Sequence, residues 1–445
     1  MRTSTEFTPA LIRDDAETQK RRNAIKGAFF SEFVDLLDIY LPVVVLAPVL
    51  FYFHPPNLDP GLEAMLGSLV FITTLVGRPV GALIFGAVAD RMGRRMASIW
   101  SVGGFALVTL LIALLPGYQS LGITSYWLLI LLRFVDGIFL GGGYTGAIPL
   151  ALEYSRKQDR GFVGGLILAA FPAAYVTINL MAIAMFALFP LDGVNSPYAQ
   201  VGWRIPFIIG AALAGLLLLY YIFKVSESEV WQTKASEARE KLPLSSLVRG
   251  RSGRNMLQVI LLMTGFWLTQ NIITIFVPAT LLREFLHLSK FELTTTLLLS
   301  YSILFFTYIG SGMISQRIGR RLFFMIVAPL IATVGAATLY VLVTVEGMSL
   351  PLIMLLVCLL SILVTSPWGV IVSYINERFV TDVRATGFGA AYSLSVVIPS
   401  FYAFYMAWLG NFMPFRLTPV LLMCIGGVIA FAGAAIGPET KNVDL

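Results

Sequence analysis

Long apolar stretches follow one another along the chain and are separated by short polar segments. An α-helix needs roughly 20 apolar residues to cross a bilayer, and twelve stretches come close to this length or exceed it. They are too continuous for the strands of a β-barrel, which alternate apolar and polar positions over about 10 residues. The pattern predicts an all-α polytopic membrane protein with spans near residues 25–52, 62–89, 96–115, 124–151, 161–189, 203–224, 255–282, 292–315, 322–344, 350–374, 385–409 and 414–437.

The spans fall into two groups of six, which predicts two six-helix lobes. We expect a cytoplasmic N-terminal tail without regular structure at residues 1–24 and an N-terminal lobe at 25–224. A mixed-charge cytoplasmic linker follows at 225–254, then a C-terminal lobe at 255–437 and a cytoplasmic tail at 438–445. The first apolar stretch is too long, and too interrupted by acidic residues, to be a cleavable signal peptide.

A short basic motif occurs twice, 226 residues apart, once in each half of the chain. Residues 86–95 read GAVADRMGRR and residues 312–321 read GMISQRIGRR. Glu153 and Arg160 recur in the same way as Glu377 and Arg384. Internal repeats in transporters place the binding site between the repeated units. The duplication therefore predicts a two-lobed transporter with a central site.

Composition and charge agree with this topology. The chain is 57% hydrophobic and 13% charged, with a mean hydropathy of +0.82. If the N-terminus is cytoplasmic, 25 of the 31 lysines and arginines lie on the cytoplasmic side and four on the other. Basic residues concentrate on the cytoplasmic side of membrane proteins, so we expect a multi-pass protein of the inner (plasma) membrane with both termini cytoplasmic. Topology accounts for the net charge of +6 without a nucleic-acid partner.

Several motifs together resemble the major facilitator superfamily, and within it the metabolite:proton symporter family of α-ketoglutarate, shikimate and proline/betaine permeases. They are GRPVG at residues 77–81, FG at 85–86, DRMGRR at 90–95, WRIPF at 203–207 and VRATG at 383–387. The resemblance implies the major facilitator fold and proton-coupled uptake of a small organic acid or a zwitterionic osmolyte. It also implies that the repeated basic motif forms an inner gate between the lobes.

The chain departs from the family pattern where charges matter. Gly143 stands where the family often has Glu, and Asp136 replaces a common Gln. In the first helix Asp35 takes a Glu position and Glu32 replaces a neutral Asn. Because the acidic groups are rearranged, the substrate of a characterised relative does not transfer to this chain.

Six charged residues lie well inside the predicted spans, away from the span ends, and all six are in the N-terminal half. Such groups are costly in a bilayer and usually face a cavity or a partner. Three acids share one side of the first helix at i, i+3 and i+6 spacing, and two of the others are one turn apart. The six are Glu32, Asp35, Asp38, Arg78, Arg133 and Asp136.

Each of these charges has a structural alternative. Arg133 and Asp136 form a local ion pair in one reading, and Arg78 neutralises an acid of the first helix in another. Four acids and two arginines do not cancel, so we expect at least one carboxylate to take up a proton. The proton-coupling candidates are Glu32, Asp35, Asp38 and Asp136, and Arg78 and Arg133 are the candidate counter-charges for a substrate anion. The two histidines, His54 and His287, are expected near the outer face.

The C-terminal half offers polar and aromatic candidates for substrate contact. Gln270 and Asn271 are informative because buried amides need hydrogen-bond partners. For Trp368 and Tyr392 two interpretations are open: contact with the substrate, or packing in the core.

The repeated basic motifs are the candidates for the inner gate, with topology anchoring as the alternative. Gln316 replaces Asp90 in the second copy, which predicts an asymmetric gate. The gate candidates are Gly86, Asp90, Arg91, Gly93, Arg94, Arg95, Glu153, Arg160, Arg317, Arg320, Glu377 and Arg384.

The leading hypothesis is proton-coupled symport of a small organic anion by a monomer in the lipid bilayer. Uptake of a betaine-like zwitterion, efflux by antiport and a transporter-like sensor are the alternatives. No nucleophile–base set, nucleotide loop or metal-ligand spacing occurs in the sequence, so we expect neither an enzyme nor a bound cofactor or metal.

Overall fold

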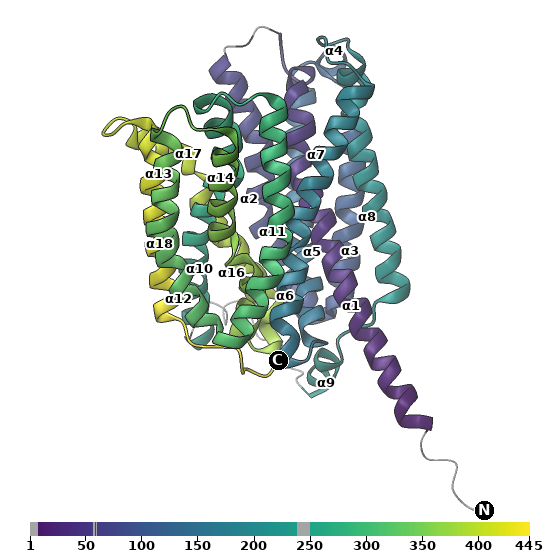
Figure 1. Cartoon of the computed structure of the whole chain (residues 1–445). Helices are drawn as coiled ribbons and strands as arrows, with labels where there is room; N and C mark the ends of the chain where they lie inside the picture. The colour runs from purple at the N-terminus through teal and green to yellow at the C-terminus, as the bar shows by residue number, and fades with distance from the viewer. Residues whose placement is uncertain (1–7, 57, 59, 238–249) are drawn as a thin grey trace, which may run out of the picture.

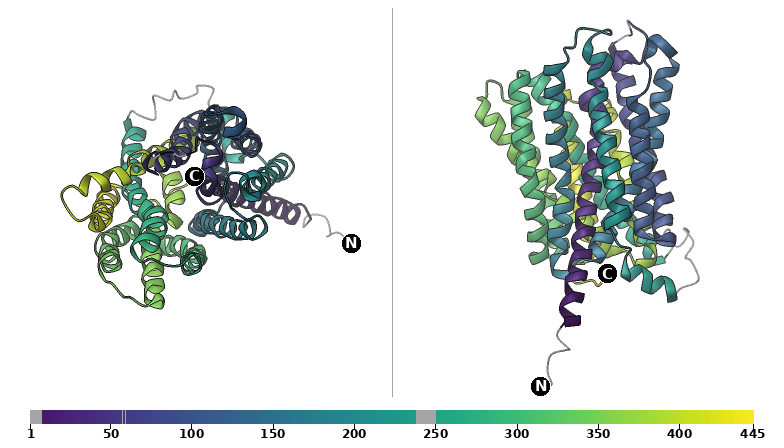
Figure 2. Two further views of the ribbon diagram at one scale, coloured as in Figure 1. Left: turned by 90° about the horizontal axis from the view of Figure 1, so that it is seen from above. Right: turned by 90° about the vertical axis from the view of Figure 1, so that its right-hand side faces the viewer.

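The computed structural model describes residues 8–445 except 57, 59 and 238–249. Within these residues, twelve helical segments are long and apolar enough to cross a membrane, as predicted. They form two bundles side by side, and both ends of the described chain lie at the same end of the molecule (Figure 1; Figure 2). We call this end, which carries both copies of the basic motif, the basic end.

The six spans of the N-terminal lobe are built from ten helical elements. They are α1 (Thr8–Leu41), η1 (Pro42–Leu46) and η2 (Ala47–Tyr52) in span 1; α2 (Pro60–Met92) in span 2; α3 (Arg94–Ala113) in span 3; α5 (Thr124–Glu153) in span 4; α6 (Arg160–Leu168) and α7 (Ala170–Leu188) in span 5; and η4 (Tyr198–Gly202) and α8 (Arg204–Lys224) in span 6.

The C-terminal lobe repeats this plan. Its elements are α10 (Gly250–Asn271) and η6 (Ile272–Phe285) in span 7; α11 (Lys290–Ile318) in span 8; α12 (Arg320–Leu330), η7 (Ile331–Gly335) and α13 (Ala336–Thr344) in span 9; α14 (Leu350–Thr365) and α15 (Trp368–Arg378) in span 10; α16 (Arg384–Ser400) and α17 (Tyr402–Leu409) in span 11; and α18 (Thr418–Ile436) in span 12. Short connecting elements are α4 (Tyr118–Leu121), η3 (Lys157–Asp159), α9 (Glu229–Glu237), η8 (Thr381–Val383) and η9 (Phe415–Leu417).

Three spans that the hydrophobic pattern predicted as single helices are interrupted. The interruptions lie beside Pro172, Pro367 and Pro399. Proline lacks the N–H that would continue the helical ladder, and its ring crowds the preceding turn. The length of an apolar stretch does not reveal these breaks, because a proline inside the stretch does not shorten it.

The polar segment before the first span is helical from Thr8 onward, and the expectation of an irregular tail is wrong for residues 8–24. Residues 1–7 lie outside the described part, as do residues 238–249 of the predicted linker. Side chains of the helical segment at residues 8–24 contact two short elements that connect the spans. Lys20 pairs with Glu229 of α9, and Arg21 pairs with Asp159 of η3, each at 2.6 Å. These ion pairs and a composition rich in good helix formers extend the helix beyond the bilayer length.

The lobes meet along pairs of helices, with α2 against α16 and α6 against α11. Inside the N-terminal lobe, glycines permit α2 and α5 to approach each other closely. A Cβ on Gly81 of α2 would lie 1.8 Å from the Ile138 carbonyl of α5, and one on Gly141 of α5 would lie 2.3 Å from the Arg78 carbonyl. Small residues in membrane helices allow this backbone contact, which positions α2 and α5, the helices that carry three of the six buried charges.

Candidate functional site

The six intramembrane charges predicted from the sequence are all buried, and they gather in the N-terminal lobe. Three come from α1, one from α2 and two from α5. They form two separate clusters, one at the face shared with the C-terminal lobe and one inside the N-terminal lobe.

The first cluster surrounds Arg78. Its Nη2 donates a hydrogen bond to Asp35 Oδ2 at 3.1 Å, and its guanidinium carbon lies 4.9 Å from the centre of the Tyr144 ring. Asp35 Oδ1 and Glu32 Oε2 have no hydrogen-bond partner within the described part of the chain. The cluster therefore holds one cation, two carboxyl groups and spare acceptor capacity.

The second cluster surrounds Arg133, which is fully buried. Its Nη1 donates to Asp38 Oδ2 at 3.1 Å and to Asp136 Oδ2 at 2.8 Å. The hydroxyl of Thr109 in α3 donates to Asp38 Oδ1 at 2.8 Å. Two carboxyl groups share one guanidinium, and an unpaired buried charge costs several kcal/mol. One proton on this pair of acids would remove the excess negative charge.

The C-terminal lobe presents a group of aromatic rings to the Arg78 cluster. Trp267 of α10, Trp368 of α15 and Tyr392 of α16 contact one another, with ring centres 4.4 to 6.2 Å apart. Tyr392 also lies 5.2 Å from Tyr144, whose hydroxyl contacts that of Ser393. Trp267 and Tyr144 were not among the predicted site residues, because an aromatic residue in an apolar helix carries no signal that separates ligand contact from packing.

The two amides of span 7 behave differently. Asn271 Nδ2 donates to the Pro399 carbonyl at 3.0 Å and so supports the interrupted helix α16–α17. The buried Gln270 Oε1 has no partner among the described residues, so this oxygen has spare acceptor capacity.

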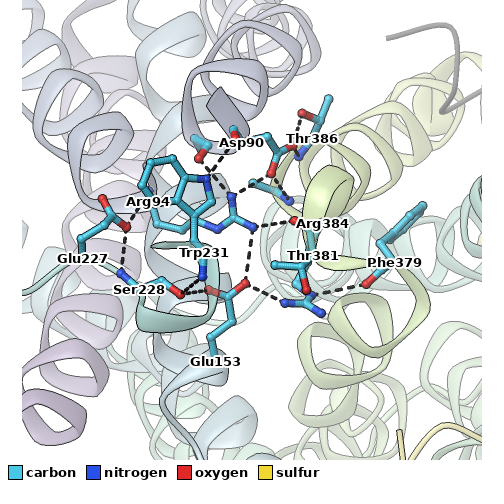
Figure 3. Close-up of polar contacts among 12 residues, drawn as sticks. Asp90, Arg94, Glu153, Glu227, Ser228, Trp231, Phe379, Thr381, Arg384 and Thr386 are labelled. Carbon is cyan, nitrogen blue, oxygen red and sulfur yellow. Dashed lines mark hydrogen bonds and ion pairs between the residues drawn. The ribbon is translucent and has the colours of Figure 1, made fainter. Parts of the chain in front are cut away.

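At the basic end, Asp90 of α2 joins the lobes by capping a helix of the other lobe (Figure 3). Its carboxylate accepts hydrogen bonds from the backbone N–H of Ala385 at 3.2 Å and of Thr386 at 3.0 Å, and from the Thr386 hydroxyl at 2.5 Å. Arg94 Nη1 donates to Asp90 at 2.9 Å. A carboxylate at a helix N-terminus is favoured by the unpaired N–H groups and the dipole there, so Asp90 links α2 to α16.

Glu153 forms a second link between the lobes at this end (Figure 3). It accepts from Arg384 Nη1 at 2.6 Å and from Arg94 Nη2 at 3.4 Å, and Ser228 donates to its other oxygen. Arg94 also donates to the Thr381 carbonyl of the C-terminal lobe at 2.8 Å. These contacts close the basic end between α5 and α16.

The second copy of the motif makes weaker contacts across the lobes. Gln316 Oε1 accepts from the Gly161 N–H at 3.1 Å, and its Nε2 donates to the Lys157 carbonyl at 3.2 Å. Glu377 pairs with Arg320 of its own lobe at 3.3 Å, whereas Arg160 donates to the Val443 carbonyl at 2.6 Å. The two halves of the network thus differ in the charge and in the partners of equivalent residues.

Two glutamates that the sequence analysis did not single out organise each copy. Glu227 accepts from the N–H groups of Arg94 and Arg95, and Glu439 accepts from those of Arg320 and Arg321. The signal for this role was present, since ES at 227–228 recurs as ET at 439–440. Burial raises the pKa of the nearby Tyr154 to about 12, so its hydroxyl stays protonated and donates to the Glu227 carbonyl at 2.6 Å.

The remaining gate candidates have local roles in the structure. Gly86 approaches α16 so closely that a Cβ would lie 2.6 Å from Thr386 Cα, and Gly93 has a φ of +112° at the start of α3. Arg95 donates to the carbonyls of Tyr221 and Ile222 at the end of α8. Arg91 and Arg317 have exposed side chains.

Two six-helix lobes, buried charges at their shared face and a duplicated polar network at one end define a secondary transporter. The chain belongs to the Major Facilitator Superfamily, whose family model matches residues 28–403. The predicted superfamily, the helical fold and a transporter rather than an enzyme are confirmed.

Similar proteins include the Proline/betaine transporter of Escherichia coli (strain K12). It is 25% identical over an alignment of 452 residues, which covers 98% of this chain and 87% of that protein. The Inner membrane metabolite transport protein YhjE of the same strain is 25% identical, with coverage of 99% and 97%. The Ectoine/proline transporter ProP of Corynebacterium glutamicum is 28% identical, with coverage of 87% and 78%. Among solved structures, the proton:xylose symporter XylE has a TM-score of 0.76 at 19% identity, with coverage of 96% and 98%.

Proposed function

We propose that this transporter takes up a small zwitterion, with a carboxylate and a quaternary or secondary ammonium group, together with protons. The observation that carries the proposal is the position of Arg78. Its side chain is 7% exposed and lies between acids of α1 and aromatic residues of both lobes. One site thereby offers a cation for a carboxylate and, beside it, rings and a carboxyl group for an ammonium.

The two ends of such a substrate have distinct partners. The planar guanidinium of Arg78 suits a carboxylate, which it binds with paired hydrogen bonds. An ammonium group is attracted to the faces of aromatic rings, and Trp267, Trp368 and Tyr392 form the nearest group of rings. The unpartnered oxygen of Glu32 adds a hydrogen-bond acceptor on the same side. Relatives named for proline, betaine and ectoine support this substrate class.

The proton site of the proposal is the Arg133 cluster. Its two acids share one guanidinium inside the N-terminal lobe. The aromatic group belongs to the C-terminal lobe, so the proposal assigns substrate and proton to different places. Asp35 and Glu32 are the alternative carriers, because each has an oxygen without a partner.

A small organic acid is the second candidate, favoured by the Arg78–Asp35 pair. If Asp35 takes up a proton, Arg78 loses its counter-charge and becomes available to a substrate carboxylate. The proton and the anion then enter together without adding net charge to the site.

The orientation follows from the basic loops. We propose that the basic end faces the cytoplasm, with both termini there, and that the protein acts as a monomer in the inner membrane. The lobe boundaries at residues 25–224 and 255–437 belong to the same proposal.

Uptake by the purified protein in liposomes tests the substrate class. Labelled glycine betaine, proline and a set of mono- and dicarboxylates are compared under a pH gradient that is acidic outside. We expect the zwitterions to accumulate. Trp368→Leu should weaken their uptake about 2- to 30-fold through loss of a cation–π contact, while Trp408→Leu, at a ring that is 62% exposed, should not. Accumulation of the carboxylates alone favours the second candidate, and accumulation of neither class overturns the proposal.

A further inference from the structure

A polar cavity of about 340 Å³, largely open to its surroundings, lies at the basic end, apart from the central site. Its walls come from the loop between spans 4 and 5, from the end of α11 and from the segment after span 12. The lining residues are Arg156, Lys157, Gln158, Gln316, Lys441 and Asn442.

The chemistry of the lining is uniform. Three of the six side chains are cationic and three are amides, and none is a carboxylate. Lysine, arginine and amide N–H groups are the donors that bind phosphate oxygens in proteins. The cavity therefore matches a ligand with negative charge and several acceptor oxygens.

Contacts around the cavity hold its walls in place. Lys441 Nζ donates to the Arg317 carbonyl at 3.1 Å, and the Gln316 side chain bridges Lys157 and Gly161. Lys157 pairs at 2.7 Å with Asp444, whose side chain is 90% exposed. An exposed ion pair of this kind contributes little stability, so an incoming anion displaces Asp444 from Lys157 at small cost.

The walls belong to both lobes. Arg156, Lys157 and Gln158 adjoin spans 4 and 5 of the N-terminal lobe, whereas Gln316, Lys441 and Asn442 adjoin spans 8 and 12 of the C-terminal lobe. We propose that this cavity binds a phosphate group and thereby holds the basic end closed. A ligand that contacts both lobes only in the closed state shifts the equilibrium toward that state by its difference in affinity. The phosphate comes from free phosphate or from an anionic lipid headgroup.

The test follows the opening of the basic end with a reporter cysteine. Thr145→Cys, in a chain with Cys358→Ser and Cys424→Ala, places the thiol where α5 faces α16, beside Gly389. The labelling rate is measured in phosphatidylcholine nanodiscs with inorganic phosphate, against sodium chloride of equal ionic strength. A second set of nanodiscs contains phosphatidylglycerol and no free phosphate. With phosphate at ten times its dissociation constant, labelling should slow about tenfold if only the closed state binds.

The double variant Arg156→Gln/Lys441→Gln should lose this response, while Arg22→Gln/Lys224→Gln, which removes two exposed cations at the same end, should keep it. Lys441→Arg retains the charge and should also respond. A response to inorganic phosphate identifies free phosphate as the ligand, and a response only to phosphatidylglycerol identifies the headgroup. The proposal is overturned if neither slows labelling, or if the double variant responds as strongly as the parent.

Discussion

Arg78 and Arg133 are both buried among carboxyl groups, yet their surroundings differ in a way that separates two tasks. Arg78 contacts one acid and an aromatic ring at the face between the lobes. Arg133 contacts two acids and lies entirely within one lobe. The first environment is open to a partner from the other lobe, and the second is suited to holding a proton.

Arg78→Lys tests the first of these roles. Lysine keeps the positive charge but lacks the planar fork that binds a carboxylate with two hydrogen bonds. Loss of a charge-assisted hydrogen bond costs about 1.5–3 kcal/mol, so uptake should fall about tenfold or more while the protein still reaches the membrane. The measurement is initial uptake normalised to the amount of protein in the membrane. Uptake close to that of the parent would rule out Arg78 as the carboxylate ligand.

The sequence was sufficient to locate these charges and to suggest the local Arg133–Asp136 pair, but not to tell which acid of the first helix meets which arginine. A charged residue in an apolar stretch is conspicuous, and all six were identified in advance. Their partners come from helices distant in the sequence: Asp35 and Arg78 are 43 positions apart, and Asp38 and Arg133 are 95. Which acid meets which arginine depends on helix packing. Aromatic residues such as Trp267 were missed for a related reason, since their position between the lobes is a property of the assembled bundle.

At the scale of the helices, length and apolar character predicted the twelve spans well. The interruptions beside Pro172, Pro367 and Pro399, and the extension of α1 to Thr8, depend on backbone hydrogen bonds and on contacts with loops. The glycines of α2 and α5 belong to this scale, because they set the distance between helices that carry the charges.

Gly81→Ala tests the packing of α2 on α5. The added methyl group would lie 1.8 Å from the Ile138 carbonyl, so the helices must move apart. Overpacking of this kind costs about 1–3 kcal/mol and should lower the melting temperature of the purified protein. Gly215→Ala in α8 is the matched control, since its methyl group would have no neighbour within 4 Å. Equal melting temperatures for the two variants would contradict the packing argument.

At the scale of the whole molecule, the basic end is closed by a network that is duplicated in sequence and unequal in strength. Asp90 offers a charge to the N-terminus of α16, and Glu153 pairs with Arg384 across the lobes. The equivalent positions, Gln316 and Glu377, offer neutral hydrogen bonds and a pair within one lobe. A transporter that opens at this end must break the stronger half of the network.

Asp90→Asn should therefore open the basic end more than Gln316→Ala does. Hydrogen bonds to a charged group contribute about 1.5–3 kcal/mol and neutral ones about 0.5–1.5 kcal/mol. Labelling of Thr145→Cys, in the chain lacking Cys358 and Cys424, measures the open fraction in each variant. Equal increases in the labelling rate would show that the two copies act symmetrically.

The central claim is that a proton held by the Arg133 cluster drives the accumulation of a substrate bound at Arg78. The most direct measurement compares two activities of Asp38→Asn in liposomes: uphill uptake under a pH gradient, and exchange of labelled for unlabelled substrate at equal pH. The variant has one carboxyl group fewer to take up and release the proton. We expect this variant to lose gradient-driven accumulation and to keep exchange, because exchange needs no net proton release. Accumulation by Asp38→Asn to the level of the parent chain would rule out the Arg133 cluster as the proton site.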